Sequence, residues 1–124
     1  MFDLATDSDS IALITEFAEA GKVVSAVCHG PAALVNVKTK DGEWLVKGAE
    51  VTGFSDAEEE MMGLVEAMPF PLEGKLRERG GVFVKADEPW GVKVAVAKGG
   101  LLITGENPAS ATGTAEAVKN ALGL

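Results

Sequence analysis

The sequence predicts an α/β domain with a mainly parallel sheet. Short apolar runs typical of strands alternate along the chain with runs that repeat apolar side chains at helical spacing. The run Val23–Val27 is apolar on both alternations, which is typical of a central parallel strand covered on both faces. Of the 124 residues, 47% are hydrophobic and 24% are charged, a globular composition. We therefore expect residues 1–124 to form one domain.

The first elements follow from helical spacing and from the residues that end helices. A helix is expected over residues 10–20, because its apolar side chains share one face, polar residues in front can cap it, and Gly21 ends it. The strand Val23–Val27 comes next. Pro31 suits the first turn of a short helix that reaches about Val35.

In the middle of the chain a polar turn precedes two short strands and a helix. Asp41-Gly42 is a pair typical of hairpin turns, and Trp44–Val46 and Glu50–Thr52 are the strand candidates after it. Ser55 can cap the next helix, expected over Asp56–Ala67 before two prolines break it.

The rest of the chain continues the alternation. It predicts one helix, three strands and a last helix: Leu72–Arg79, Val82–Val84, residues 92–96, Leu101–Thr104, and a helix from Ser110 or Ala111. We expect the last helix to turn Ala115, Val118 and Leu122 inward.

Composition excludes several classes of partner. The net charge of −8, without a basic cluster, opposes binding to nucleic acid or to an anionic membrane. No apolar run is long enough to span a bilayer, and no leader segment opens the sequence. One cysteine and one histidine are too few for a structural zinc site, so no metal is expected. A single cysteine, unable to form an internal disulfide, suits a cytoplasmic protein.

The only cysteine and the only histidine, Cys28 and His29, are adjacent where the apolar run meets Gly30-Pro31. A thiol at such a strand-to-helix turn lies near unpaired backbone N–H groups and the positive end of a helix dipole, which favour the nucleophilic thiolate. The alternative is a buried cysteine that fills space. Neighbours along a regular strand point to opposite faces, so His29 reaches the sulfur only if the chain turns sharply at Cys28.

Acidic and polar residues later in the chain are candidates for the same site. Asp56 and Glu59 lie in the first turn of a predicted helix, where the dipole favours acids whatever their function. Asn107 and Ser110 follow an apolar strand, where open α/β sheets bind ligands; equally, they can form a turn and a helix cap.

Four segments resemble a known family. Ala26–Ala32, which reads AVCHGPA, is similar to the nucleophile motif of the ThiJ/PfpI superfamily. Val51–Glu59, Pro69–Glu73 and Leu102–Ser110 are similar to three further segments of that family in the same order. The chain resembles most the branch that contains glutathione-independent glyoxalases and heat-shock chaperones. The resemblance implies a flavodoxin-like α/β sandwich.

The resemblance also implies roles for single residues. Cys28 would be the nucleophile, His29 an acid or base, and Glu59 the carboxylate that orients His29, with Asp56 as the alternate. Gly30 and Asn107 are the candidate substrate-binding or oxyanion residues. Glu106 departs from the family's pattern, because it stands where the family tends to have glutamine.

The implied activity is the conversion of methylglyoxal, a small dicarbonyl, into lactate through a cysteine hemithioacetal, with no cofactor. The alternatives are a stress-protective chaperone, deglycase or peptidase-like member of the same superfamily, and an inactive half-domain that needs a partner.

The resemblance covers only the C-terminal half of the family's domain. A glycine loop and a glutamate that the family places beside the cysteine belong to the other half. Without that half, Val23–Val27 becomes an uncovered sheet edge, so we expect a homo-oligomer or a complementing N-terminal chain. A rearranged compact fold that covers the strand is the alternative.

Overall fold

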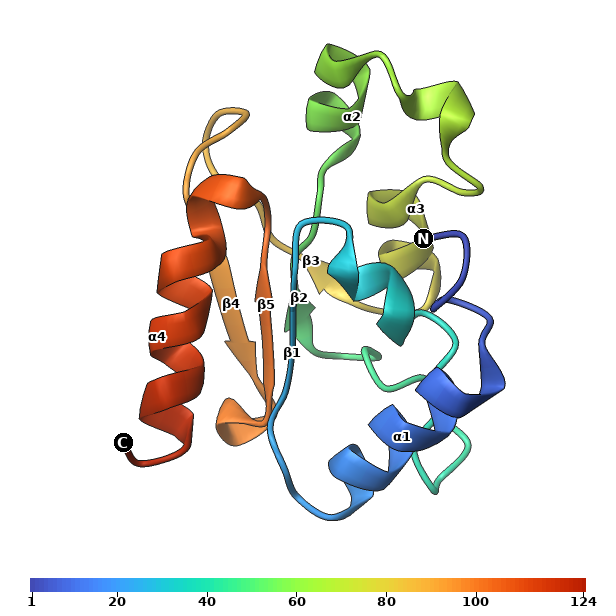
Figure 1. Ribbon diagram of the computed structural model, residues 1–124, viewed down its shortest axis with the longest axis vertical. Coiled ribbons are helices and arrows are strands. Elements are labelled where there is room, and N and C mark those ends of the chain that lie inside the picture. The colour runs from blue at the N-terminus through green and yellow to red at the C-terminus, as the bar shows by residue number, and fades with distance from the viewer.

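The computed structural model contains two small sheets within an α/β arrangement (Figure 1). The larger sheet has the strand order β1-β5-β4, with β1 (Val24–Val27) parallel to β5 (Leu102–Gly105) and β4 (Val94–Ala97) antiparallel to β5. The smaller sheet pairs β2 (Glu50–Val51) in parallel with β3 (Val82–Phe83). The prediction of an α/β fold with a mainly parallel sheet is confirmed.

Helices lie on both sides of the larger sheet (Figure 1). α4 (Ala111–Ala121) covers one side, and α1 (Ser8–Glu19) and α3 (Leu72–Glu78) lie on the other, while α2 (Asp56–Met62) stands beyond one end of the strands. Four short 3₁₀ turns complete the chain: Gly30–Leu34, Val65–Ala67, Lys98–Gly100 and Pro108–Ser110. None of the helices combines the length and the apolarity that a membrane span requires.

Caps and glycines set the helix ends. Asp7 accepts a hydrogen bond from the backbone N–H of Ser10 at 2.8 Å and so starts α1. α2 starts with a reciprocal capping box between Ser55 and Glu58 and ends at Gly63, which adopts a left-handed φ of 68°. The prediction that this helix continues to Ala67 is therefore wrong, because the chain leaves helical geometry at Gly63.

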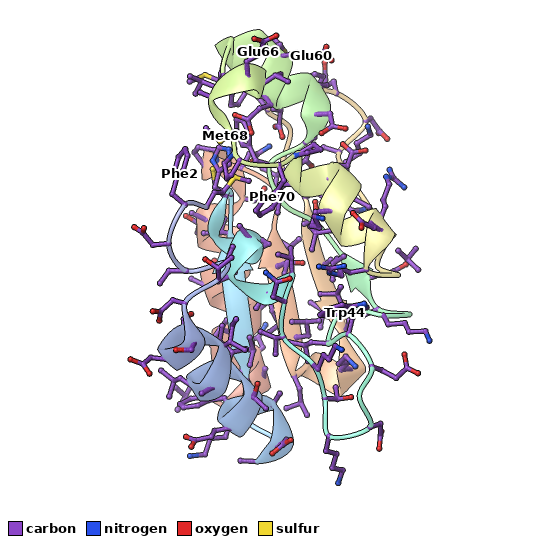
Figure 2. The ribbon with its side chains drawn as sticks, turned by 90° about the vertical axis from the view of Figure 1, so that its right-hand side faces the viewer. Phe2, Trp44, Glu60, Glu66, Met68 and Phe70 are labelled. Atoms are coloured by element: carbon purple, nitrogen blue, oxygen red, sulfur yellow. The ribbon has the colours of Figure 1, made fainter.

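Two further local predictions are wrong. Trp44–Val46 forms no strand: only an isolated bridge joins Trp44 to Lys38. The Trp44 ring (Figure 2) instead packs against two cations, with Lys38 Nζ at 4.7 Å and Arg79 Cζ at 3.9 Å from its centroid.

α4 also turns a different face inward than the one predicted. Thr114 is its buried residue, and its hydroxyl donates to the Ser110 carbonyl at 2.8 Å. Ala115 and Leu122 are exposed, which contradicts the expectation that they pack inward, and Val118 is half-buried. The apolar face of α4 is thus partly uncovered.

The hydrophobic core lies on the α1 and α3 side of the sheet. Fifteen buried residues form one cluster, to which α3 contributes Leu72 and Leu76 and the strands contribute Val51 and Leu102. β1 was expected to be a central strand, but in this chain it pairs only with β5 and its other edge is open. The expectation of an uncovered edge at Val23–Val27 is confirmed.

Gly105 allows close packing where β5 reaches α4. A Cβ added there would overlap Thr114 Oγ1 and lie 3.0 Å from Val27 Cγ2. We expect Gly105→Ala to lower the free energy of unfolding by about 1–3 kcal/mol, because the strand and the helix must separate. Urea denaturation measures this loss. Gly30→Ala is the control, since its Cβ would meet Ala26 at an ordinary 3.4 Å, and an equal loss in both variants would contradict the argument.

Candidate active site

Cys28 lies on a sharp turn directly after β1. Its φ of 63° is in the left-handed region, which costs a residue with a Cβ about 1–2 kcal/mol. Two backbone hydrogen bonds hold this conformation: Cys28 N–H donates to the Gly105 carbonyl at 3.0 Å, and Phe54 N–H donates to the Cys28 carbonyl at 2.8 Å. The chain therefore makes the sharp turn at Cys28 without which His29 could not reach the sulfur.

Gly53 lets the segment after β2 approach this turn closely. A Cβ on Gly53 would lie 3.1 Å from Leu72 Cδ2 and 3.3 Å from the Cys28 carbonyl oxygen, both tighter than ordinary contacts. The glycine thus brings the start of α2, with its acidic residues, close to the thiol.

The turn places the thiol, the imidazole and one carboxylate in a line of contacts. Cys28 Sγ lies 3.7 Å from His29 Nδ1, and His29 Nε2 lies 2.7 Å from Glu59 Oε2. An ionised carboxylate only accepts hydrogen bonds, so the proton of a neutral His29 is on Nε2 and the Nδ1 lone pair faces the sulfur. Such an imidazole is placed to accept the thiol proton.

Glu59 is held in the interior. Its side chain is only 8% exposed, and its second oxygen, Oε1, is buried without a hydrogen-bond partner. Asp56, the alternate acid, is exposed and has no contact with His29. The structure thus brings Glu59 and not Asp56 to the imidazole.

Aromatic rings pack against the imidazole. The ring centroids of His29 and Phe54 are 4.4 Å apart with a tilt of 34°, and Trp90 packs edge-on against Phe54 at 5.5 Å. Neither Phe54 nor Trp90 was singled out from the sequence as a site residue. An aromatic residue next to a glycine at the end of a strand was the only available signal.

Asn107 is buried and bonded on both ends of its amide. Its Nδ2 donates to Glu58 Oε2 and to the Gly91 carbonyl, each at 2.7 Å, and its Oδ1 accepts from Ser110 N–H and Oγ. Its contacts therefore tie α2 to the turn after β5. Gly30 is exposed at the start of the 3₁₀ turn behind Cys28.

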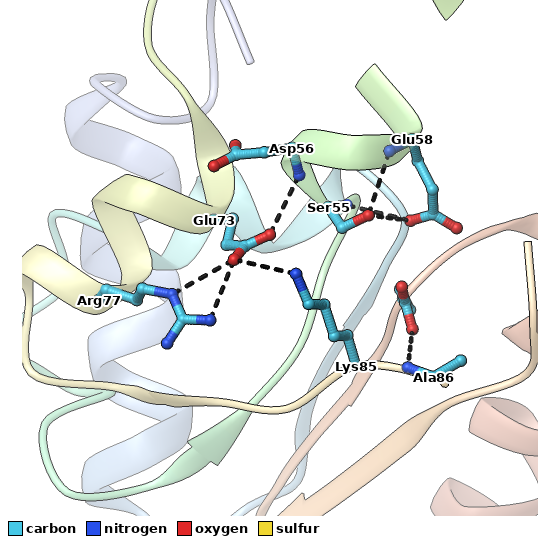
Figure 3. Close-up of polar contacts among 8 residues, drawn as sticks. Ser55, Asp56, Glu58, Glu73, Arg77, Lys85 and Ala86 are labelled. Atoms are coloured by element: carbon cyan, nitrogen blue, oxygen red, sulfur yellow. Dashed lines mark hydrogen bonds and ion pairs between the residues drawn. The ribbon is translucent and has the colours of Figure 1, made fainter. Parts of the chain in front are cut away.

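The carboxylate of Glu73, on α3, holds the first residue of α2 (Figure 3). Glu73 accepts from the Asp56 N–H at 3.1 Å and from Arg77 Nη2 at 3.0 Å, and Lys85 Nζ lies 3.6 Å away. Together with the capping box, these contacts immobilise the turn that carries Glu59. No group of three or more acidic, cysteine or histidine side chains is arranged to hold a metal ion.

The thiol is less acidic than the sequence suggested. Burial raises the pKa of Cys28, and the nearby charges of Glu58 and Glu59 raise it further, against a hydrogen bond from the His29 backbone that lowers it. The backbone N–H of His29 favours the thiolate as expected, but burial and the two acids outweigh it, and only a five-residue 3₁₀ turn follows the cysteine, so the expectation of a net lowered pKa is wrong.

This raised pKa predicts slow alkylation of Cys28. Because less thiolate is present at any given pH, the rate of reaction with iodoacetamide should rise at higher pH than for N-acetylcysteine. Mass spectrometry of the chain, which holds one cysteine, measures the rate directly. A profile that coincides with that of the free thiol, or lies at lower pH, would contradict the role of burial and of the two acids.

The fold and the contacts define a class: an α/β protein with a thiol at a strand-to-helix turn, linked through a histidine to a buried carboxylate. No protein-family model matches the chain. Glyoxalase 3 of Candida albicans is 35% identical over 123 residues, which are 95% of this chain and 51% of that protein. A probable glutathione-independent glyoxalase of Schizosaccharomyces pombe is 42% identical over 106 residues, covering 82% of this chain and 47% of the relative.

Solved structures agree with these sequence matches. The crystal structure of glyoxalase III from Candida albicans superimposes with a TM-score of 0.88 at 34% identity, over 97% of this chain and 52% of that chain. The chain belongs to the ThiJ/PfpI superfamily, with glutathione-independent glyoxalases as its relatives, as its motifs predicted. It spans about half the length of the curated relatives it matches.

Proposed function

We propose that this chain carries the nucleophile, the proton acceptor and the orienting acid of a glutathione-independent glyoxalase. The observation that supports this proposal is the line of contacts from Cys28 Sγ to His29 Nδ1 at 3.7 Å and from His29 Nε2 to Glu59 Oε2 at 2.7 Å. The same residues lie in segments shared with relatives named glyoxalases. The proposed substrate is methylglyoxal and the product is lactate.

The first step joins substrate and protein. The Cys28 sulfur bonds to the aldehyde carbon, and the thiol proton passes by way of His29 to the aldehyde oxygen, which gives a hemithioacetal. Glu59 stabilises the imidazolium that forms on the way. Because the thiol pKa is raised, we infer that proton removal accompanies the attack instead of preceding it.

The later steps move two protons and add one water. A base removes the hydrogen from the former aldehyde carbon while the ketone oxygen takes up a proton, which gives an enediol. The hydroxyl on the former aldehyde carbon then loses its proton as a proton is delivered to the former ketone carbon, which leaves a lactyl thioester on Cys28. Water then attacks the thioester carbonyl, and the carbon–sulfur bond breaks to release lactate and the thiol. The aldehyde carbon is oxidised as the ketone carbon is reduced, so the net reaction needs only water.

A glutathione-free assay tests the proposal. Methylglyoxal consumption and lactate formation are measured for the chain and for Cys28→Ser, each alone and together with the part of the Candida albicans relative that lies outside the match. We expect turnover that falls at least about 100-fold in the variant. Equal turnover in both proteins would contradict the proposal, as would its absence from the folded chain in both settings.

We also propose a reducing compartment, the cytoplasm, as the location of the protein. Cys28 is free and half-buried, and a nucleophilic thiol persists only where disulfide formation is disfavoured. Cell fractionation with an antibody against the chain tests this, and recovery only in an oxidising compartment would contradict it.

A further inference from the structure

The loop between β3 and β4 carries an aromatic side chain toward the histidine of the site. Residues 84–93 form no helix or strand, and Trp90 in this loop is 38% exposed. Its ring lies edge-on against Phe54, with the two centroids 5.5 Å apart. Phe54 is buried, and its centroid lies 4.4 Å from that of the His29 ring. Trp90 thus supports the ring that packs on the imidazole.

Contacts from the interior hold the backbone of Trp90 in an unfavourable conformation. Its φ of 67° lies in the left-handed region, which a residue with a Cβ adopts only where its surroundings fix it. Trp90 N–H donates to Glu58 Oε2 at 2.9 Å, and the Gly91 carbonyl accepts from Asn107 Nδ2 at 2.7 Å. Asn107 Nδ2 also donates to Glu58 Oε2 at 2.7 Å. The carboxylate and the amide therefore hold this turn together.

Two further hydrogen bonds fix the ends of the loop. Ala86 N–H donates to Glu106 Oε2 at 2.8 Å, and Lys93 N–H donates to Ser110 Oγ at 3.0 Å. The side chains that hold the loop, here and at Trp90, are all at most 1% exposed. Breaking these hydrogen bonds would leave buried polar groups without partners, which is costly. The loop is therefore fixed to the interior, although its tip faces solvent.

We propose that Trp90 is a positioning residue, which acts on His29 through Phe54. Contacts at the two ring nitrogens leave an imidazole free to tilt, and packing against the face of the ring removes that freedom. The packing thus keeps Nδ1 toward the thiol and Nε2 toward Glu59. Proton transfer depends on this alignment, because displacements of about 1 Å in a catalytic site can cost 10²-fold in rate.

The single histidine of the chain allows a direct test by NMR. Carbon-13 relaxation of the ring C–H groups should give an order parameter of about 0.85 in the unaltered chain and below about 0.6 in Trp90→Leu, values typical of rigid and flexible groups. Trp90→Phe, which keeps an aromatic ring, should restore most of the order. An order parameter that is the same in Trp90→Leu and in the unaltered chain would overturn the inference.

Phe17→Leu is the matched control. Phe17 is an aromatic residue on α1 that is 41% exposed, and its ring lies under the Lys22 ammonium group, 5.2 Å from the centroid. This substitution should leave the order of the imidazole unchanged. An equal loss of order in Phe17→Leu and Trp90→Leu would overturn the inference, because it would mean that the imidazole responds to any loosening of the fold.

Asn107→Asp tests the hold on the loop. The aspartate keeps an acceptor for Ser110 but, when ionised, cannot donate to Glu58 or to the Gly91 carbonyl. We expect hydrogen exchange at the Trp90 amide to become at least about 10-fold faster, with a fall in the order of the imidazole. Faster exchange with an unchanged imidazole would overturn the link between the loop and the site.

Turnover supplies a further readout, which rests on the proposed function. In the form of the protein that converts methylglyoxal, Trp90→Leu should lower kcat at least about 10-fold and change KM less than about 2-fold. A raised KM with an unchanged kcat would overturn the inference and assign Trp90 to substrate binding. The NMR measurements use no substrate. Absence of turnover therefore contradicts only the proposed function, and an unchanged imidazole in Trp90→Leu contradicts only this inference.

Discussion

Glu59→Gln is expected to lower the kcat for methylglyoxal by up to about 10⁴-fold, the loss seen when the orienting carboxylate of a nucleophile–histidine–acid triad becomes an amide. The carboxylate fixes the His29 proton on Nε2 through a 2.7 Å contact, so that Nδ1 can accept the thiol proton. A glutamine can donate its N–H to Nε2 instead, which moves the imidazole proton to Nδ1. That tautomer presents a donor to the sulfur and cannot take its proton.

The control for this prediction is Glu60→Gln in the same helix. The Glu60 side chain is exposed, and only its backbone carbonyl accepts a hydrogen bond, from Gly63 N–H, so the variant loses the same charge without touching His29. We expect its kcat to stay within about 2-fold of the unaltered protein. Both variants are compared in whichever form of the protein turns over, alone or completed, after circular dichroism has shown that each is folded. Unchanged kcat in Glu59→Gln would remove Glu59 from the proposed mechanism.

The residues predicted for this site could be recognised in the sequence for physical reasons. Cys28 and His29 were found because they are the only residues of their kinds and stand at a glycine-proline turn. Their contact depends on the left-handed backbone conformation of Cys28. The sequence showed that a sharp turn was needed for this contact but could not show that the turn forms. Glu59 could not be separated from Asp56 by spacing alone, since the dipole favours both acids; the family resemblance pointed to Glu59.

The elements that sequence analysis missed depend on tertiary contacts. The strand expected at Trp44–Val46 is replaced by packing of the Trp44 ring against Lys38 and Arg79, and Arg79 is distant in sequence. The inward face of α4 was assigned from apolar residues, but the close approach of Gly105 selects Thr114. In both places a contact between distant residues outweighs the local pattern.

One end of the molecule carries apolar side chains beside acidic ones. Figure 2 shows Phe2, Met68 and Phe70 at the same end as Glu60 and Glu66. Phe2 is 66% exposed, and Met68 lines a hollow of about 200 Å³ together with Glu59 and Glu60. Met68 therefore lies next to Glu59, the carboxylate proposed to orient His29.

Glu106→Gln is expected to stabilise the folded chain, and only at neutral and alkaline pH. Glu106 is 1% exposed, and its Oε2 accepts a hydrogen bond from Ala86 N–H at 2.8 Å. Burial, and then the neighbouring charge of Glu58, raise its pKa from 4.5 to about 7. Glu58 stays ionised because hydrogen bonds from Asn107, Ser55 and Trp90 lower its pKa, although burial opposes them. Glu58 and Glu106 are thus two neighbouring buried carboxyl groups, of which Glu58 is ionised and Glu106 keeps its proton up to about pH 7.

The sign of the pH effect follows from the two states of Glu106. The folded protein binds this proton more tightly than the unfolded chain, so its contribution to stability is fully present below about pH 4.5 and is lost as the pH rises through about 7. The difference between the two pKa values corresponds to about 3 kcal/mol at most. A glutamine keeps an acceptor for Ala86 N–H and carries no charge at any pH, so the variant avoids this loss.

The free energy of unfolding, measured by urea denaturation from pH 4 to pH 9, tests this prediction. The free energy of unfolding of the variant minus that of the unaltered protein should be near zero at pH 4 and should grow to about 2–3 kcal/mol at pH 8. Glu88→Gln at an exposed position is the control and should give a difference that does not change with pH. Because both proteins share every other titrating group, the subtraction isolates Glu106. Parallel curves for Glu106→Gln would mean that the unfolded and folded states bind this proton equally, and that Glu58 and Glu106 do not interact as a buried pair.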